Sequence, residues 1–504
     1  MVSSSWSTCN TTLEDSYIHE IPLFNSITFH HLGLFLAAVF GLISIVLALF
    51  LVFQHATHYL RPWEQKHIIR ILLMIPIYSS VQFLSYLFYR KAVYFQVLGN
   101  CYEAFAIASF FTLLCHYVAP NLHDQKDYFR GLAPLNWFWG VFGLQKWMVV
   151  ACSGATGYIG GDALKAIIDA HPDYEITALV RNSDKGAQVA AVYPKVSLVY
   201  GDLDSTDLLT KEASKADIVC HFANADHAPS ATALTAGLAT HSPSDPGFLI
   251  HTSGTGILLL PEIRSGIYGE ASPKIYDDLD NVAEITSLPD DAPHRLVDKI
   301  VLGAGKEFGG RVRTAIVCPP TIYGSGRGPG NRVSHQLPEL CRVTLERGHG
   351  VQVGKGLTRW GNVHVHDLSN LYLKLVEEAA AGGSSAEWEG KPAVWGPEGY
   401  YFCENGEHVW GELAGVVARE AKGMGLIGGE EVRSLTGEEA DQCSAWGSAM
   451  WGANSRGKAK RARAVLGWKA VGGTIEEDVR GALEVQAKAL GMVKGHAVKA
   501  AGDA

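Results

Sequence analysis

The residues with the clearest chemical meaning lie in a glycine-rich segment near the middle of the chain. The motif GATGYIG at 154–160 follows the apolar run MVVAC at 148–152 and precedes the helical pattern GDALKAIIDAH. This order predicts a strand, a glycine turn and a helix. Glycines let the backbone approach a phosphate closely, and the helix N-terminus offers free N–H groups and a positive dipole. The motif therefore predicts a phosphate site, with a tight turn that binds no ligand as the alternative.

The residue after the next predicted strand indicates which nucleotide would bind. Residues 174–180 (YEITALV) predict that strand, and Arg181 follows 21 residues beyond Gly160. An acidic residue at this place binds the ribose 2′-hydroxyl of NAD, whereas an arginine accommodates the 2′-phosphate of NADP. Arg181, helped by Lys185, therefore favours NADP over NAD, and a solvated surface arginine is the alternative.

Three more strand patterns follow along the chain, at residues 196–200, 216–222 and 248–252. They alternate with helical stretches, and this alternation predicts an α/β fold with a doubly wound parallel sheet. Ligands of such sheets bind at the carboxyl ends of the strands. We therefore expect a Rossmann domain with a smaller C-terminal substrate region over 148–490, followed by a disordered tail over 491–504.

Further motifs accompany the glycine turn. They are GDLD at 201–204, CPPTIYG at 318–324, GNVHVHDLSNLYL at 361–373 and LGWKA near Leu466. Together they resemble the extended and atypical short-chain dehydrogenase/reductase superfamily, in its epimerase and dehydratase branch. The resemblance implies an NAD(P) site whose pyrophosphate is held by Gly154, Thr156, Gly157, Tyr158, Ile159 and Gly160. It also implies contacts from Asp202 and Leu203 to the adenine, from Ala223 to the adjoining ribose and from Pro319 to the nicotinamide.

The resemblance also implies catalytic positions, two of which carry unexpected residues. In this superfamily a serine or threonine binds the substrate carbonyl, and a tyrosine transfers the proton. A lysine four residues after the tyrosine lowers the pKa of the tyrosine hydroxyl. Ser253 matches the first position, but His294 and Asp298 stand where the tyrosine and the lysine belong.

Three interpretations of these residues remain open. In the first, His294 is a general acid and Asp298 orients it from one helical turn away. In the second, Tyr276, 23 residues after Ser253, acts without the usual lysine, because Asp280 follows it by four. In the third, these are surface or capping groups in a domain that binds dinucleotide without ordinary catalysis.

The front of the chain has the composition of a membrane segment. Residues 32–53 form a run of 22 without a charge, long enough as a helix to cross a hydrocarbon core of about 30 Å. Residues 71–89 and 94–118 give two further spans. Glu103 lies inside the third span, where we expect it at the headgroup level or paired with Asn100; a functional role is the alternative.

Basic residues indicate how these spans are oriented. Arg61, Lys66 and Arg70 follow the first span, and the stretch after the third span holds Lys126, Arg130 and Lys146. By the positive-inside rule both stretches face the cytosol. The resulting division has an extracytosolic tail at 1–30, transmembrane helices at 31–120 and an interfacial linker at 121–147, so the Rossmann domain lies on the cytosolic side.

The same front part resembles a second family. RPWEQKHIIRILLMIPIYSSVQFLSY at 61–86 and CYEAF at 101–105 resemble the organic-solute-transporter alpha family of seven-span proteins, over roughly residues 30–145. Three of the family's spans are predicted here. Because Met148 opens a domain as an initiator residue would, we expect a fusion of two neighbouring reading frames, real or confined to the gene model.

Charge and cysteine content exclude other classes. The net charge is −9, and no basic patch interleaved with aromatic residues predicts a nucleic-acid groove. The nine cysteines are spread singly, without zinc-ligand spacing, so we expect neither a metal site nor a disulfide framework. The expected partners are the lipid bilayer and a small-molecule substrate, and nothing in the sequence indicates an oligomeric state.

The sequence thus favours a membrane-anchored, NADP-dependent oxidoreductase or epimerase-like enzyme. One alternative is an NADP-binding sensor or scaffold with weak catalysis, which the missing Tyr-x-x-x-Lys favours. Another is a truncated transporter-like membrane protein fused to a reductase reading frame.

Overall fold

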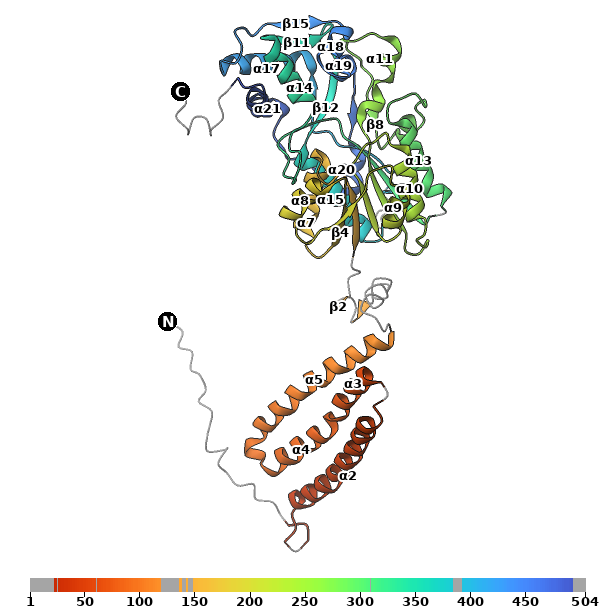
Figure 1. Ribbon diagram of the computed structural model, residues 1–504, viewed down its shortest axis with the longest axis vertical. Coiled ribbons are helices and arrows are strands. Elements are labelled where there is room, and N and C mark those ends of the chain that lie inside the picture. The colour runs from red at the N-terminus through yellow and green to blue at the C-terminus, as the bar shows by residue number, and fades with distance from the viewer. Residues whose placement is uncertain are drawn as a thin grey trace. The chain divides into compact units, whose positions relative to one another are not determined.

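The computed structural model describes eight stretches of the chain, namely residues 22–24, 26–59, 61–118, 136–137, 142–143, 148–308, 310–383 and 392–492. The chain divides into two compact units, Met1–Lys146 and Trp147–Ala504, and each is described by itself (Figure 1). The expected N-terminal tail up to residue 21, most of the linker at 121–147 and the tail from residue 493 lie outside the described residues.

The first unit consists of apolar helices that pack on one another. They are α2 (Phe29–Thr57), α3 (Pro62–Leu72), α4 (Met74–Leu87), the short 3-10 helix η1 (Tyr89–Lys91) and α5 (Ala92–Val118). Figure 1 shows α4 between α2 and α5, and α4 is in contact with each of them. In the described part of the chain, three stretches are long and apolar enough to span a membrane: Phe29–Thr57, Pro62–Leu87 and Tyr89–Tyr117.

The second of these stretches differs from the sequence expectation in two ways: it starts earlier, and it consists of two helices instead of one. It begins at Pro62 rather than at residue 71, because the polar residues after Pro62 form the first turns of α3. The helix breaks at Leu73. Pro76 explains the break, since proline has no N–H to donate to the carbonyl of Leu72 and its ring collides with that carbonyl.

Glu103 on α5 has a partner on the neighbouring helix. The hydroxyl of Tyr78, on α4, donates a hydrogen bond of 2.5 Å to Oε2 of Glu103. The expected pairing with Asn100 is wrong, because no such hydrogen bond occurs among the described residues and Tyr78 takes that place. A bonded carboxylate costs less in a bilayer than a free one, so this contact joins α4 to α5.

The second unit is built on a seven-stranded parallel sheet of order β13-β9-β7-β6-β3-β4-β5. Its strands are β3 (Val149–Ser153), β4 (Glu175–Val180), β5 (Ser197–Tyr200), β6 (Ile218–His221), β7 (Gly247–Thr252), β9 (Val312–Cys318) and β13 (Tyr400–Phe402). The central strands β6 and β7 are buried along their whole length, as expected for a sheet covered on both faces. The expected doubly wound α/β fold is confirmed.

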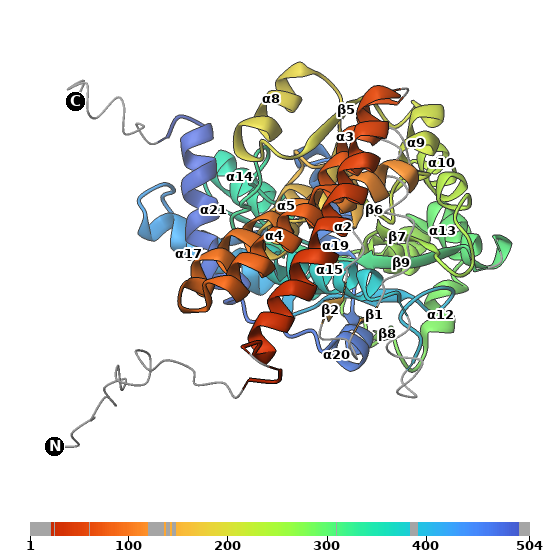
Figure 2. The same ribbon diagram turned by 90° about the horizontal axis from the view of Figure 1, so that it is seen from below.

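Helices cover both faces of this sheet. One face carries α7 (Tyr158–Ala170), α8 (Ser183–Val192) and α15 (Val365–Ala380), and the other carries α9 (Thr206–Ala213), α10 (Ala228–Leu238) and α13 (Arg295–Glu307). Figures 1 and 2 both show α9, α10 and α13 next to one another. The large apolar core lies between these layers and includes the sheet strands and α7.

The C-terminal region forms a second apolar core. Its helices and strands include α14 (Gln336–Arg347), β11 (Gly350–Val353), α17 (Trp410–Gly423), β15 (Val432–Leu435), α18 (Gly437–Cys443), α19 (Gly447–Gly452) and α21 (Ile475–Ala489). A mixed three-stranded sheet joins β10 (Thr321–Tyr323), β12 (Arg359–His364) and β14 (Glu407–Val409). The remaining described elements are β1 (Asn136–Trp137), β2 (Phe142–Gly143), η2 (Thr255–Leu259), α11 (Leu260–Ser265), β8 (Tyr276–Asp277), α12 (Val282–Thr286), β16 (Gly457–Lys458) and α20 (Lys460–Leu466).

Candidate functional site

The glycine turn after β3 needs its glycines for steric reasons. Gly154 has φ +76°, and a Cβ at this position would lie 2.9 Å from the carbonyl carbon of Phe222. The N–H of Gly157 donates a 2.8 Å hydrogen bond to the carbonyl oxygen of Gly154, and Gly157 is the N-cap of α7. A Cβ on Gly160 would lie 2.5 Å from that same oxygen. The turn therefore brings bare backbone and the positive end of α7 to the carboxyl edge of the sheet.

The next two residues of the motif, Tyr158 and Ile159, contact other parts of the domain. Tyr158 donates a 2.6 Å hydrogen bond to the carbonyl oxygen of Gly324, and burial raises the pKa of its hydroxyl. Ile159 packs against the large core. Neither residue lines the cleft described below, and Gly160 does not either. The turn itself lines it through Gly154, Thr156 and Gly157.

A cleft with a volume of about 720 Å³ opens over this turn. Such a volume is ample for a cofactor-sized ligand. Its walls come from the carboxyl ends of β3, β4, β5 and β6 and consist of Gly154, Thr156, Gly157, Leu179, Val180, Arg181, Lys185, Asp202, Leu203, Asp204, Phe222, Ala223, Asn224, His227 and Asn331. Seven of the eleven predicted cofactor residues are in this set, and Pro319 is outside it together with Tyr158, Ile159 and Gly160.

The acidic side chains of the cleft have bonding partners, whereas its two basic side chains do not among the described residues. Asp202 accepts hydrogen bonds from the Ser205 hydroxyl at 2.8 Å and the Ser205 N–H at 3.0 Å, and these bonds lower its pKa. Asp204 lies 3.1 Å from Nε2 of His227. Arg181 and Lys185 make no side-chain hydrogen bond or ion pair with any described residue. Two cations that line the cleft thus have no ion-pair partner among the described residues.

One side of the cleft is closed by the loop that contains Asn331. Nothing in the sequence indicates that this loop contacts the glycine turn. The N–H of Asn331 donates a 2.9 Å hydrogen bond to the carbonyl oxygen of Thr156. A Cβ on Gly330 would lie 2.2 Å from the same oxygen, so the two backbones are in direct contact. Arg327 anchors the loop through a 2.6 Å ion pair with the buried carboxylate of Asp162 on α7.

Outside the cleft lining, but next to the loop after β6 that contributes to it, His294 meets an aspartate from that loop. His294 is the N-cap of α13, and its Nδ1 lies 2.8 Å from Oδ1 of Asp226. This hydrogen bond is the main reason why the pKa of Asp226 is lowered. The expectation that Asp298 orients His294 is wrong, because the carboxylate on the imidazole belongs to Asp226.

Asp298 is instead part of a buried polar cluster. It accepts a 2.8 Å hydrogen bond from the hydroxyl of Tyr400. Its second oxygen, Oδ1, and the Oγ of Ser253 are both buried without a hydrogen-bond partner among the described residues. Ser253 follows β7 and is 6% exposed. Burial raises the pKa of Asp298 to about 6, against the lowering effect of the Tyr400 hydroxyl.

We expect Asp298→Asn to remove a pH dependence of stability. The folded-state pKa of about 6 lies above the ordinary value of 3.8. The neutral carboxyl therefore stabilises the fold below pH 3.8, and this contribution is lost as the pH rises through 6. The loss is on the order of 3 kcal/mol. Asparagine stays neutral and can still accept a hydrogen bond from Tyr400. The melting temperature of the variant minus that of the wild type should therefore increase between pH 4 and pH 7. A difference in melting temperature that does not change with pH would contradict this assignment.

Tyr276 lies in a different setting. It belongs to β8, which pairs with β16 outside the seven-stranded sheet, and it is 8% exposed. Burial raises its pKa, and Nζ of Lys274 lies 4.9 Å from the centre of its ring. Within the described residues its hydroxyl makes no hydrogen bond to Ser253 or His294.

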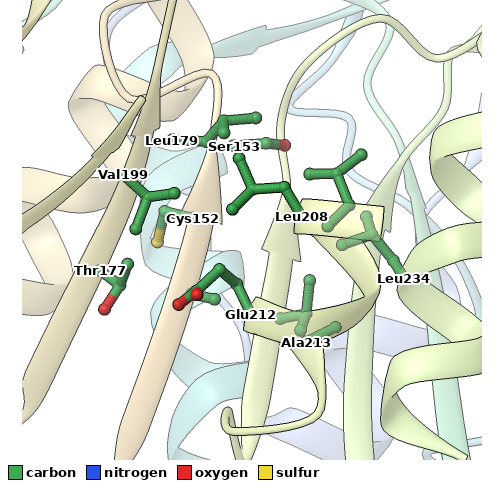
Figure 3. A pocket seen from close by; sticks show the side chains of 12 residues that line it. Cys152, Ser153, Thr177, Leu179, Val199, Leu208, Glu212, Ala213 and Leu234 are labelled. Atoms are coloured by element: carbon green, nitrogen blue, oxygen red, sulfur yellow. The ribbon is translucent and has the colours of Figure 1, made fainter. Parts of the chain in front are cut away.

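A second, small cavity lies on the sheet face that α9 and α10 cover, and it shares Leu179 with the cleft. Figure 3 shows side chains from β4, β5 and these helices around it, Leu179, Val199, Leu208 and Leu234 among them. Its volume is about 30 Å³ and its lining is almost wholly apolar. A space of this size holds a water or two at most, and only with polar partners. It is a packing gap.

The sequence analysis missed two residues of the site, Asp226 and Asn331. Asp226 lies in the loop after β6, at the sheet edge where ligands bind, and this position alone could have suggested it. Asn331 follows the alternating glycines of GSGRGPG, a pattern that indicates close backbone contact but not with which segment.

The parallel sheet, the glycine turn and the cleft at the carboxyl edge define a dinucleotide-binding protein of the Rossmann class. The family model for NAD(P)H-binding proteins matches residues 154–242, and that for the NAD-dependent epimerase/dehydratase family matches 265–389. The oxidase ucsJ of Acremonium sp. is 40% identical over 344 residues, which cover 68% of this chain and 99% of that protein. The second unit of the chain therefore belongs to the NAD(P)-binding epimerase/dehydratase family, and it is an oxidoreductase domain.

The first unit matches other proteins. The family model for organic solute transporter Ostalpha matches residues 33–159. A transmembrane protein 184 homologue of Dictyostelium discoideum is 35% identical over 132 residues, which are 25% of this chain and 24% of that protein. Protein LAZ1 homologue 1 of Arabidopsis thaliana is 42% identical over 74 residues, 15% of each chain. The chain thus carries a transporter-like membrane region fused to the oxidoreductase domain.

Solved structures of similar fold include two nucleotide-sugar enzymes. One is the UDP-glucose 4-epimerase of Thermotoga maritima, with 13% identity and a TM-score of 0.46, over 68% of this chain and 100% of that one. The other is the dTDP-glucose 4,6-dehydratase DesIV of Streptomyces venezuelae with NAD bound, with 17% identity and a TM-score of 0.47, over 69% and 99%.

Proposed function

We infer that the protein is an NADP-dependent oxidoreductase of small carbonyl or hydroxyl compounds, held on the cytosolic face of a membrane. The observation that carries this inference is the cleft over the glycine turn, in which Arg181 and Lys185 form no ion pair with any described residue. A 2′-phosphate would give these two cations an anionic partner, and the hydroxyl of NAD would not. The relative from Acremonium is an oxidase by name, which supports the reaction class.

The chain's own residues fit the coenzyme. The bare backbone of Gly154 and Gly157 and the N-terminus of α7 would hold the pyrophosphate. Leu203 and Ala223 would contact the adenosine part. When bound, the nicotinamide supplies or accepts a hydride. Ser253, whose hydroxyl is buried, would donate a hydrogen bond to the substrate oxygen.

Membrane anchoring is supported by the three candidate spans. The basic residues that follow the first span, Arg61, Lys66 and Arg70, favour a cytosolic position for the segment after it. With three spans, the segment after the third span lies on that same side. The oxidoreductase domain would then act on a substrate that reaches it from the cytosol or from the bilayer surface.

A catalytically weak NADP sensor is the second candidate. It is favoured by Asp298, because a buried carboxyl bonded to Tyr400 cannot replace the lysine that activates a tyrosine. Such a sensor would bind the coenzyme but would not convert a substrate.

Incubation of the purified full chain with NADPH and a panel of aldehydes and ketones tests the proposal. We expect loss of the 340 nm absorbance of NADPH with at least one carbonyl compound, at a rate several-fold above that with NADH. Binding of NADPH with no oxidation of it across the panel would support the sensor instead.

A further inference from the structure

A histidine and an aspartate from two separate loops form a pair beside the cleft, although neither of them lines it. Nδ1 of His294 lies 2.8 Å from Oδ1 of Asp226, and the two residues are 68 positions apart in the chain. Asp226 belongs to the loop that also contributes Ala223, Asn224 and His227 to the cleft. The His294 side chain is 23% exposed and that of Asp226 57%, so both can exchange protons with water.

The backbone holds the imidazole in a defined place. His294 has φ +66°, a left-handed conformation that is unfavourable for a residue with a Cβ. Strained residues of this kind persist where the surrounding structure fixes them, often at functional sites. Nε2 of the ring faces two glycines after β7, since a Cβ on Gly254 would lie 3.1 Å from it and one on Gly256 3.0 Å. Ser253, which is also buried, belongs to the same strand end.

We propose that His294 is the general acid and base of this site and that Asp226 is its positioning residue, in place of a tyrosine and lysine. The inference deepens the proposed function and rests on it. Asp226 accepts a hydrogen bond from Nδ1–H, which fixes the ring orientation. This leaves Nε2, the nitrogen that faces Gly254 and Gly256, to exchange the substrate proton.

The neighbouring ionisable groups do not compete for this role. His251, one strand position before Thr252, is fully buried, and burial together with His221 and His294 holds its pKa well below the ordinary value. It therefore stays neutral. Asp298 is bonded to Tyr400, and the guanidinium of Arg295 donates to backbone carbonyls of Thr286 and Leu288.

Reduction of a carbonyl would form a C–H bond with the hydride that NADPH supplies, which carries its own electron pair, and an O–H bond with a proton. The π electrons of the C=O bond would move to oxygen, which would take the proton from Nε2 of a doubly protonated His294. The imidazole would then be neutral, with its remaining proton on Nδ1 and bonded to Asp226, and the loss of the two electrons would leave NADP in its oxidised form. In the oxidation of an alcohol, Nε2 accepts the hydroxyl proton.

Variants of the full chain in detergent test the proposal, with phenanthrenequinone as the carbonyl probe and NADPH as coenzyme. His294→Asn keeps a residue that tolerates the left-handed backbone, and it should lower kcat about 100-fold or more with little change in the Kd for NADPH. Asp226→Asn should lower kcat about tenfold or more, and Asp226→Glu should recover part of it. Asp291→Asn, a control whose carboxylate is also 57% exposed and pairs with Arg264, should leave kcat unchanged.

Nitrogen NMR of histidine-labelled chain gives a readout that does not depend on turnover. The resonances of His294, identified by their absence in His294→Asn, should show the proton on Nδ1 in the wild type and a shift toward the other tautomer in Asp226→Asn. Equal turnover of wild type and His294→Asn, or a proton on Nε2 in the neutral wild-type ring, would overturn the inference while NADPH binding still supports the proposed function. A wild type that binds NADPH but reduces nothing overturns the catalytic assignment in favour of the sensor, and failure to bind NADPH overturns the proposed function itself.

Discussion

Gly154→Ala is expected to weaken NADPH binding about 100-fold or more. The position has φ +76°, and a methyl group there would lie 2.9 Å from both the carbonyl carbon and the carbonyl oxygen of Phe222. Both atoms belong to backbone, so neither can rotate away. The turn must shift, and the shift moves Thr156 and Gly157 away from the pyrophosphate they would hold. Titration followed by tryptophan-to-NADPH energy transfer measures the affinity.

Gly266→Ala is the matched control for this experiment. Gly266 has φ +65°, nearly the same conformation, but a Cβ there meets nothing within 4 Å. The control therefore carries the cost of a left-handed alanine, about 1 kcal/mol, without the collision. NADPH affinity should survive in Gly266→Ala. An unchanged affinity in Gly154→Ala, with the fold intact by circular dichroism, would argue that no coenzyme lies against this turn.

The second large effect concerns the choice between the two coenzymes. We expect the double substitution Arg181→Ser and Lys185→Ser to lower NADPH affinity about 100-fold and to leave NADH affinity within a few-fold. Both cations line the cleft, and both nearby acids are engaged by Ser205 and His227. Each cation would form a charge-assisted hydrogen bond with the 2′-phosphate, of about 1.5–3 kcal/mol.

Lys195→Ser provides the control, because Lys195 is an exposed cation of the same unit that does not line the cleft. It should leave both affinities unchanged. Calorimetric titration of the four combinations of wild type and double variant with NADPH and NADH gives the switch directly. Equal losses for NADPH and NADH would mean that the two cations act on the shared pyrophosphate and not on the 2′-phosphate.

The parts of the fold that depend on local pattern could be predicted from the sequence. The strands expected at 174–180, 196–200 and 216–222 occur at Glu175–Val180, Ser197–Tyr200 and Ile218–His221. Apolar runs bounded by turns fix such strands within a few residues. The glycine turn was also predicted from its local pattern, but the close contact of Gly154 with Phe222 after β6 could not be read from that pattern. Strand β13 has only the residues Tyr400–Phe402, too few for any periodicity, and its place beside β9 is set by tertiary contacts.

The acid–base pair could not be predicted in the same way. A residue four positions along a helix is the natural partner of a side chain on that helix, which is why Asp298 was expected to orient His294. His294, however, is the N-cap of α13 with a left-handed backbone, so its ring does not follow the helix face. Asp298 faces Tyr400 across the core, and the ring meets Asp226 of a loop 68 positions earlier. Such a meeting depends on where the sheet places both loops.

The central claim is that the backbone after β3 binds the pyrophosphate of a nicotinamide coenzyme. Titration of the purified full chain with NADPH and with NADH, followed by energy transfer from tryptophan and by the melting temperature, tests it most directly. We predict saturable binding of NADPH, tighter than that of NADH, and a melting temperature that rises with NADPH concentration, because a ligand that binds the folded state stabilises it. Neither saturation nor a rise in melting temperature with either coenzyme would contradict the claim.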